Sequence, residues 1–392
     1  DAILHEWPEG TVFPGFCLAH SSQGMDRPNE NVPVAPFLDV KDSIDPVSFY
    51  FEDKLRQGVV GIGILPGNNT VIGGLGRVVA PRGMTLEEMT LSPGLGMKVA
   101  IGPRFRWSRS AQLTELREAE AKLQDELRRK GRELLEKKAA DADRKKIESR
   151  SGGDSKAKKK GADEDAEADE GGFVRFGEDF PGKELISRKD VPEPEQGLVD
   201  LLNGDLRIWL WCPEGTDVVH GRQWAEGHDL LSKVVFVIGP AAWKAAGVLA
   251  QAGRPVFLEG GLWHVERDPV TWEEKRTFVP KALFDAGVTF AIGPVEGQMG
   301  PDRLAFQAAA CVREGIPRQT ALDAVTTVPA AMWGLENRMG SLREGADGTF
   351  VILDGDPLGA TTKVLEVWVR GERVYERSRD QRLQKLLKGE DS

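Results

Sequence analysis

Seven short apolar runs, separated by helix-like stretches, constrain the fold of this 392-residue chain more than any other feature. None of the runs alternates apolar with polar residues, so each is typical of a strand buried on both faces, as in a parallel sheet. Strands that alternate with helices indicate βα units, and this number of strands favours a closed βα barrel over an open sheet. The runs span residues 12–19, 59–66, 97–102, 206–211, 233–239, 254–260 and 288–293.

The two ends of the chain have a different pattern. Residues 340–377 contain two alternating strands around a turn region rich in Gly, Asp and Pro, which predicts a small antiparallel β module. The chain begins at Asp1, close to the first apolar run, and we expect that a preceding segment supplies part of this module. Any targeting signal would lie in that segment, so we assign no localisation.

Residues 109–195 interrupt the strand–helix pattern and are interpreted as an insertion in a loop. Their first part is rich in charge and leucine, and Glu120 and Lys130 interrupt a rough 3/4 leucine seam. This pattern predicts a solvated helix or helical hairpin, with a coiled-coil contact as the alternative. A basic run followed by an acidic run, at about 150–172, lacks apolar residues to bury and is expected to be disordered.

Charge and cysteine content exclude several classes of protein. The formal net charge is −10 and no basic stripe with interleaved aromatic residues occurs, which argues against nucleic-acid binding. No apolar run reaches the ~18 residues that a membrane span needs. The three cysteines are far apart and form no Cys-x-x-Cys pair, so a disulfide framework and a thiolate zinc site are both unsupported.

Several stretches share their order and spacing with one known family. They are "VFPGFCLAH" (12–20), "GVVGIGILPGNNTVIGG" (58–74), "GMKVAIG" (96–102), "LFDAGVTFAIG" (283–293), the segment 321–358 and "VLEVWVRGERVYE" (364–376). Together they resemble the amidohydrolase superfamily, and most closely its imidazolonepropionase-like branch. The resemblance implies an α/β fold: a TIM-like (β/α)8 barrel over 15–335, and a small composite β-sandwich. That sandwich would combine a residual strand in 1–14 with a C-terminal part and terminal helix in 336–392.

The resemblance also implies metal-assisted hydrolysis of C–N bonds, with metal ligands at the C-terminal ends of barrel strands. Matched position by position, the first ligand is His20. The remaining positions of the pattern hold Leu18, Ser22, Trp209 or Trp211, Ile238 and Pro294. None of these is a good metal ligand, and catalytic zinc needs about three protein ligands. We therefore expect no bound cofactor; zinc would be required only if the protein is an active hydrolase.

A lone histidine does not replace a metal in this chemistry. A bound metal lowers the pKa of water from about 15.7 to about 7, whereas a general base contributes a factor of roughly 10²–10⁴. The candidate catalytic residues are nevertheless His20, Asp217 and Glu296, because Asp217 matches an acidic family position and Glu296 follows a strand. Glu259 also ends a strand-like run, and two converging carboxylates could act as acid and base.

Aromatic and histidine side chains elsewhere have structural interpretations. Trp209, Trp211, Trp243 and Trp263 are expected to fill the emptied metal cavity, with an aromatic ligand pocket as the alternative. His228 lies in a polar helix-like stretch and is expected to pack or to face solvent.

Three functions follow. The first is a metal-deficient pseudoenzyme that acts as partner or scaffold, pairing with an active amidohydrolase paralogue or with itself. The second is an active hydrolase of amide or cyclic amide C–N bonds with a nonstandard site. The third is a small-ligand-binding module at a Trp-lined barrel mouth.

Overall fold

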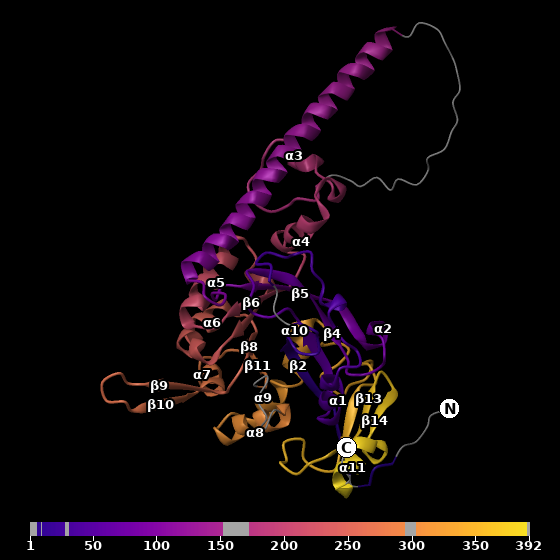
Figure 1. Cartoon of the computed structure of the whole chain (residues 1–392), viewed down its shortest axis with the longest axis vertical. Helices are drawn as coiled ribbons and strands as arrows, with labels where there is room; N and C mark the ends of the chain where they lie inside the picture. Colours follow the sequence, from indigo (N-terminus) through magenta and orange to yellow (C-terminus); the bar gives the residue numbers. More distant parts are fainter. Residues whose placement is uncertain (1–5, 9, 28–30, 152–171, 295–302, 390–392) are drawn as a thin grey trace, which may run out of the picture.

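The centre of the molecule is a curled eight-stranded sheet. The computed structural model describes residues 6–8, 10–27, 31–151, 172–294 and 303–389. The strand order is β11-β8-β7-β6-β5-β4-β3-β2, and the outer strands β2 and β11 contact each other, so the sheet forms a nearly closed, TIM-like barrel (Figure 1). Its strands are β2 (Phe16–Ser21), β3 (Val59–Ile64), β4 (Ile72–Val79), β5 (Thr90–Ala100), β6 (Ile208–Cys212), β7 (Val234–Ile238), β8 (Val256–Leu258) and β11 (Phe290–Ile292).

All seven apolar runs of the sequence contribute strands to this barrel. Because β4 is antiparallel to both β3 and β5, and the other neighbours pair in parallel, the seven strands other than β4 share one direction. Their side chains are almost all buried, as expected for strands covered on both faces.

The predicted regular alternation of strands and helices, as in a (β/α)8 barrel, is wrong at β4. This strand returns directly from β3 and runs antiparallel to it, with no helix between the two strands. Its glycines weaken the strand pattern in the sequence and permit close backbone approach. A Cβ on Gly74 would lie 2.3 Å from the carbonyl oxygen of Leu38.

Helices surround the barrel (Figure 1). The helix α10 packs against β2, where Trp333 Nε1 donates a hydrogen bond to the carbonyl oxygen of Ala19 at 2.9 Å. No helix among the described ranges is both long and apolar enough to cross a membrane. The helices are α1 (Phe49–Arg56), α2 (Leu86–Met89), α3 (Arg109–Ser151), α4 (Glu193–Leu202), α5 (Gly215–Gly227), α6 (Ala246–Ala252), α7 (Val279–Asp285), α8 (Leu304–Arg313), α9 (Arg318–Asp323), α10 (Thr327–Trp333) and α11 (Gln381–Lys388).

Both ends of the described chain meet in one small sheet. Its order is β1-β12-β13-β14, and β1 (Thr11–Phe13) pairs antiparallel with β12 (Phe350–Leu353). The remaining strands are β13 (Val364–Val369) and β14 (Glu372–Glu376), one strand more than the alternating pattern predicted. The described residues form a single sheet here, so a two-layered sandwich stays a prediction.

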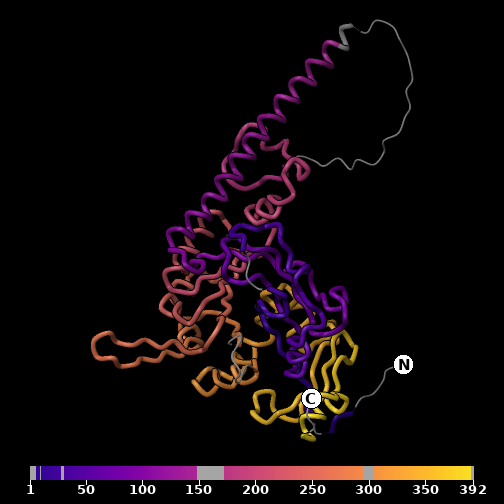
Figure 2. Tube along the Cα trace, in the orientation of Figure 1, coloured from indigo at the N-terminus to yellow at the C-terminus, as the bar shows by residue number. Residues whose placement is uncertain are grey.

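The charged insertion begins with one continuous helix, α3, of 43 residues. Figure 2 shows it reaching far beyond the barrel. Its leucine seam is not solvated throughout: Leu116, Leu123 and Leu127 are buried and belong to the same apolar cluster as Val174 and Ile186. The stretch expected to be disordered falls almost wholly outside the described residues. A second projection is the hairpin of β9 (Trp263–Arg267) and β10 (Glu274–Phe278) (Figure 2).

Candidate functional site

His20 lies inside the barrel, near the C-terminal end of β2. Only 2% of its surface is exposed. The hydroxyl of the neighbouring Ser21 exchanges a hydrogen bond with the Tyr50 hydroxyl at 2.8 Å, and Ser22 Oγ donates to the carbonyl oxygen of Pro66 at 3.2 Å. The two serines therefore fix the chain after β2, while the imidazole of His20 points into the barrel.

The Lys98 ammonium contacts His20 directly. Lys98 lies on β5 and is fully buried, and its Nζ is 2.7 Å from His20 Nε2. An ammonium can only donate, so Nε2 is the acceptor and the imidazole carries its hydrogen on Nδ1. Burial, and then the charge of Lys98, hold the pKa of His20 well below its usual range. His20 is therefore neutral at pH 7, and its basic nitrogen is already engaged.

Glu259 lies on the opposite side of the same ring. This residue follows β8, and its Oε1 is 3.6 Å from His20 Nδ1. Its Oε2 accepts hydrogen bonds from Asn68 Nδ2 at 2.6 Å and from Trp211 Nε1 at 3.2 Å. The side chain is 25% exposed, so the row Lys98–His20–Glu259 leads from the barrel interior toward solvent. Active sites of barrels lie at this carboxyl end of the strands.

The loop that carries Asn68 is held in place by hydrogen bonds at the two residues that follow it. Arg104 Nε donates to the carbonyl oxygen of Asn69, and Thr70 Oγ1 donates to that of Pro33. Because only the amide nitrogen of Asn68 can donate to Glu259, its Oδ1 points elsewhere, and this oxygen is buried without a hydrogen-bond partner. Such an acceptor is rare in a folded protein and calls for an explanation, such as a water, an ion or a ligand that binds it.

The described residues do not fit a metal ion. A ligating histidine must offer a free lone pair, but His20 Nε2 accepts the Lys98 hydrogen bond and Nδ1 faces Glu259. Across the described ranges, no three His, Cys, Asp or Glu side chains are grouped so that they could hold one. At the positions that carry ligands in the resembling family, Ile238 and Pro294 offer only hydrocarbon side chains. A buried ammonium lies beside the imidazole instead.

Asp217 has other partners than His20. It lies in the first turn of α5, where it accepts a hydrogen bond from Arg109 Nε at 2.6 Å and one from the backbone N–H of Glu214 at 3.1 Å. These contacts explain its complete burial as a helix cap and an ion pair between α3 and α5. Glu296 lies outside the described residues. A catalytic role for either carboxylate stays a prediction.

The tryptophans divide between the barrel interior and other places. Trp209 is fully buried, with its ring centroid 6.0 Å from that of His20, and Trp211 binds Glu259. Trp263 instead packs on Phe278 in the hairpin, with ring centroids 4.9 Å apart. The structure thus brings two of the four expected tryptophans to this site, and Trp243 lies in the short helix η5 (Pro240–Ala245).

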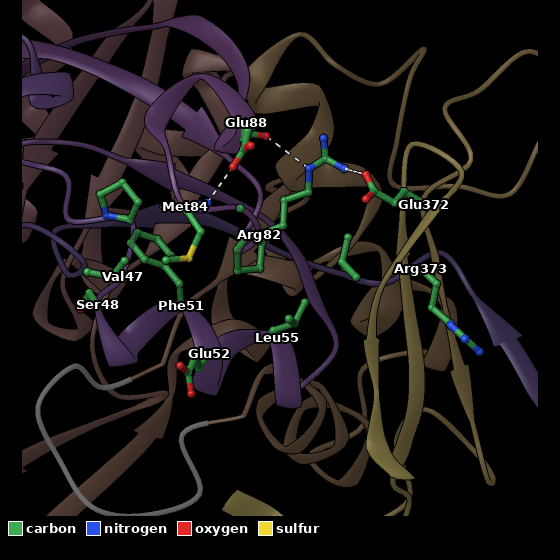
Figure 3. A pocket seen from close by; sticks show the side chains of 14 residues that line it. Val47, Ser48, Phe51, Glu52, Leu55, Arg82, Met84, Glu88, Glu372 and Arg373 are labelled. Carbon is green, nitrogen blue, oxygen red and sulfur yellow. Dashed lines mark hydrogen bonds and ion pairs between the residues drawn. The ribbon is translucent and has the colours of Figure 1, made fainter. Parts of the chain in front are cut away.

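A cavity of about 670 Å³ lies elsewhere, between α1, the turn at 81–88 and β14 (Figure 3). Its charged groups bind one another: Arg82 Nη1 donates to Glu372 at 2.8 Å, and the Met84 N–H donates to Glu88 Oε2 at 2.7 Å. The residues that line this cavity include neither histidine nor cysteine.

Lys98 and Asn68 are the site residues that the sequence interpretation missed. A signal existed for Lys98, because a lysine inside the apolar run "MKVAIG" must be buried if the run is a two-sided strand. No comparable signal existed for Asn68, which lies in a Gly/Asn-rich loop typical of an ordinary turn.

Comparisons with known proteins agree with this architecture. Residues 304–375 match a family model described as the amidohydrolase family. Amidohydrolase tasK of Hapsidospora irregularis is 31% identical over 96 residues, which are 24% of this chain and 10% of that protein. The match therefore spans only a small part of that relative's length.

The fold is similar over nearly the whole chain. The crystal structure of an amidohydrolase from Thermotoga maritima MSB8 superimposes with a TM-score of 0.66 at 22% sequence identity, covering 94% of this chain and 88% of that one. Residues 304–375 are thus similar in sequence to the amidohydrolase family, and almost the entire chain shares the fold of an amidohydrolase structure.

Proposed function

We propose that this chain is a non-hydrolytic protein of the amidohydrolase fold, from the imidazolonepropionase-like branch, that acts as a partner or scaffold. One observation carries the proposal: the Lys98 ammonium donates to His20 Nε2 at 2.7 Å. The positive charge inside the barrel is then supplied by a lysine side chain of the protein itself. An ammonium has no empty orbital with which to polarise a carbonyl or to acidify water, so it does not substitute for a Lewis acid.

His20 is also poorly suited to act as a general base. Its lone pair accepts the Lys98 hydrogen bond, and its lowered pKa makes proton uptake unfavourable near pH 7. Even a free base contributes a factor of only about 10²–10⁴. An active hydrolase with a nonstandard site is therefore the weaker alternative, and Glu259 rather than Asp217 would be its carboxylate.

The exposed projections support a partner role. All side chains of α3 from Glu136 to Ile147 are exposed, and the hairpin tip exposes Val270 at 83% and Trp272 at 69%. The two apolar side chains at the hairpin tip are available for contact with a partner, and we rest this part of the proposal on them. The proposed partner is an active amidohydrolase paralogue or a second copy of this chain.

Metal content and hydrolysis test the proposal together. The purified protein, and a Lys98→Met variant that frees Nε2, are dialysed against zinc and measured by elemental analysis. Both are then assayed on cyclic amides, dipeptides and lactones. We expect substoichiometric zinc and no turnover above buffer in either protein. About one tightly bound zinc per wild-type chain, or turnover that a His20→Asn substitution abolishes, would show that the chain is a hydrolase.

A second candidate, a ligand-binding module at the barrel mouth, is favoured by the unpaired Asn68 Oδ1 beside the partly exposed Glu259. Trp211 contacts Glu259 and reports binding by its fluorescence. Ligands of this site should change the emission of the wild-type protein, and should change it less in Trp211→Phe. The matched control, Trp272→Phe at the hairpin tip, should retain the full response. Equal responses in both variants would exclude this site.

A further inference from the structure

Three basic residues precede three neighbouring barrel strands. Arg207 comes directly before β6, Lys233 directly before β7, and Arg254 two residues before β8. These strands are parallel and adjacent, so their amino ends meet at one edge of the barrel. That edge is opposite the carboxyl end where Glu259 lies, and the three cations are therefore a separate feature of the molecule, called here the basic rim.

Strand register places the two arginines of the basic rim near each other. Ile208, the residue after Arg207, pairs with Val234. Arg254 Nε donates a hydrogen bond to the carbonyl oxygen of that same Val234 at 3.2 Å. Both arginines thus flank the first residue of β7, and Lys233 is the residue before it.

The arginine side chains are half-buried rather than free in solvent. Arg207 packs against the C-cap of α10: its Nη2 lies 2.7 Å from the position that a Cβ of Gly334 would take. Gly334 has φ +74°, a backbone conformation that favours glycine, and the absence of a side chain there lets Arg207 come close. Burial lowers the pKa of both guanidinium groups, and the charge of Arg207 lowers that of Arg254 further.

Neither arginine has a carboxylate partner among the described residues. Elsewhere in those ranges, half-buried arginines form direct ion pairs, as Arg56 does with Asp380 at 2.7 Å. Near the basic rim, Glu336 attracts Arg207 only over a longer distance, and Asp205 is already paired with Arg175. Two like charges held close together, partly desolvated and without a counter-charge, are an unfavourable arrangement for a purely structural role.

We propose that the basic rim binds a tetrahedral oxyanion, a phosphate or sulfate group, between Arg207 and Arg254 with Lys233 at its outer side. Each guanidinium group binds such an anion through paired N–H donors. Two guanidinium groups together can bind more oxygens than the two of a carboxylate, which favours a tetrahedral oxyanion. The anion supplies the missing counter-charge. It is either a free ion or the phosphoryl group of a larger molecule, and both present the same chemistry to the rim.

Thermal unfolding of the full chain tests this site. Sodium phosphate, sodium sulfate, sodium acetate and a phosphorylated sugar are compared with sodium chloride at equal ionic strength. The variant is Arg254→Gln. Its amide N–H lies as many bonds from the backbone as the arginine Nε and can still donate a hydrogen bond, but the positive charge is removed. The matched control is Arg222→Gln on α5, an arginine whose charge is already paired with Glu226 and whose side chain also binds Gln251.

We expect phosphate and sulfate to raise the melting temperature of the wild type and of Arg222→Gln, with acetate close to chloride. In Arg254→Gln the apparent Kd for phosphate should increase at least tenfold. Without the anion, Arg254→Gln should be no less stable than the wild type, because a repulsion is removed. A stronger response to the phosphorylated sugar than to phosphate identifies the larger ligand as the source.

Two results would overturn the proposal. One is an equal phosphate response in Arg254→Gln and Arg222→Gln, which would mean that the effect is general screening. The other is a clear loss of stability of Arg254→Gln in chloride without any phosphate effect in the wild type, which would mean that Arg254 has a structural role only.

Discussion

Lys98 Nζ and His20 Nε2 lie 2.7 Å apart in a part of the barrel that excludes solvent from both side chains. A buried ammonium is stable only if it has hydrogen-bond acceptors, and the imidazole is one of them. The same contact that satisfies Lys98 adds to burial in lowering the pKa of His20. The two residues therefore have to be understood as a pair, and their titration is the most direct measurement of it.

Replacing Lys98 by methionine should raise the pKa of His20. Burial and the Lys98 charge both lower this pKa, and the substitution removes the second cause while it preserves side-chain volume. The pKa should stay below the usual 6.5, because the ring remains buried. NMR titration of the imidazole, with the His20→Asn variant for assignment, measures it. An unchanged value in Lys98→Met would contradict the contact.

Acid should destabilise the protein through His20. A histidine whose pKa is lower in the folded than in the unfolded chain contributes stability above about pH 6.5 that is lost as the pH falls, since the unfolded chain binds the proton more readily. Urea unfolding at pH 7.5 and 5.5 should therefore show a smaller pH effect in His20→Gln than in the wild type. Parallel pH profiles would argue against a buried neutral imidazole.

His228 should respond to pH in the opposite sense. Glu120, on α3, accepts a hydrogen bond from Trp224 Nε1 at 2.7 Å and lies 3.4 Å from His228 Nε2, and this carboxylate raises the pKa of His228. The stabilisation is complete below about pH 6.5 and is lost as the pH rises through the folded-state pKa. Glu120→Gln should lower the pKa of His228 in an NMR titration. Glu118→Gln, an exposed change on the same helix, should leave it unaltered.

Glu195 should make the packing of α4 on α3 sensitive to neutral pH. Burial, and then the neighbouring Glu126, raise its pKa to about 7. An acid with a raised pKa contributes stability at low pH that is lost as the pH rises toward that value. Compared with the wild type, Glu195→Gln should therefore lose less stability between pH 5 and pH 8 in urea unfolding. Coincident slopes for the two proteins would rule out the shared proton.

Gly131 is required by a close backbone approach in the insertion. A Cβ at this position of α3 would lie 2.8 Å from the carbonyl oxygen of Pro181. Alanine normally favours a helix by about 1 kcal/mol over glycine, but the overlap here should make Gly131→Ala destabilising by roughly 1–3 kcal/mol. Gly247→Ala in α6, where nothing lies within 4 Å, should be neutral or stabilising. Urea unfolding that ranks the two variants in the reverse order would exclude this contact.

The sequence predicted the barrel well and its site poorly, for identifiable reasons. A strand buried on both faces has an unmistakable composition, so runs such as 206–211 and 233–239 were correctly interpreted. The strand β4 was missed because its glycines serve close packing and leave little apolar pattern. His20 was found as a residue type at a strand end, but its partners come from β5, a loop and the end of β8, and no local pattern brings them together.

Asp217 shows the opposite case. The sequence suggested a catalytic carboxylate, because an acidic residue follows a barrel strand at a family position. The residues Glu214 and Asp217 also have the spacing of a capping box, and the structure shows that arrangement at the start of α5. The cap follows from local geometry within one helical turn, whereas a catalytic role depends on residues distant in the sequence and stays a prediction.

The pairing of β1 with β12 has a consequence for biosynthesis. Strand β1 ends at Phe13 and its partner β12 begins only at Phe350, so a nascent chain emerging from the ribosome carries β1 without its partner while all the residues between them are synthesised. At roughly 5–20 residues per second, that delay lasts tens of seconds. During this time β1 lacks the strand that it pairs with in the folded protein, so the small sheet is completed only after the barrel residues have been synthesised.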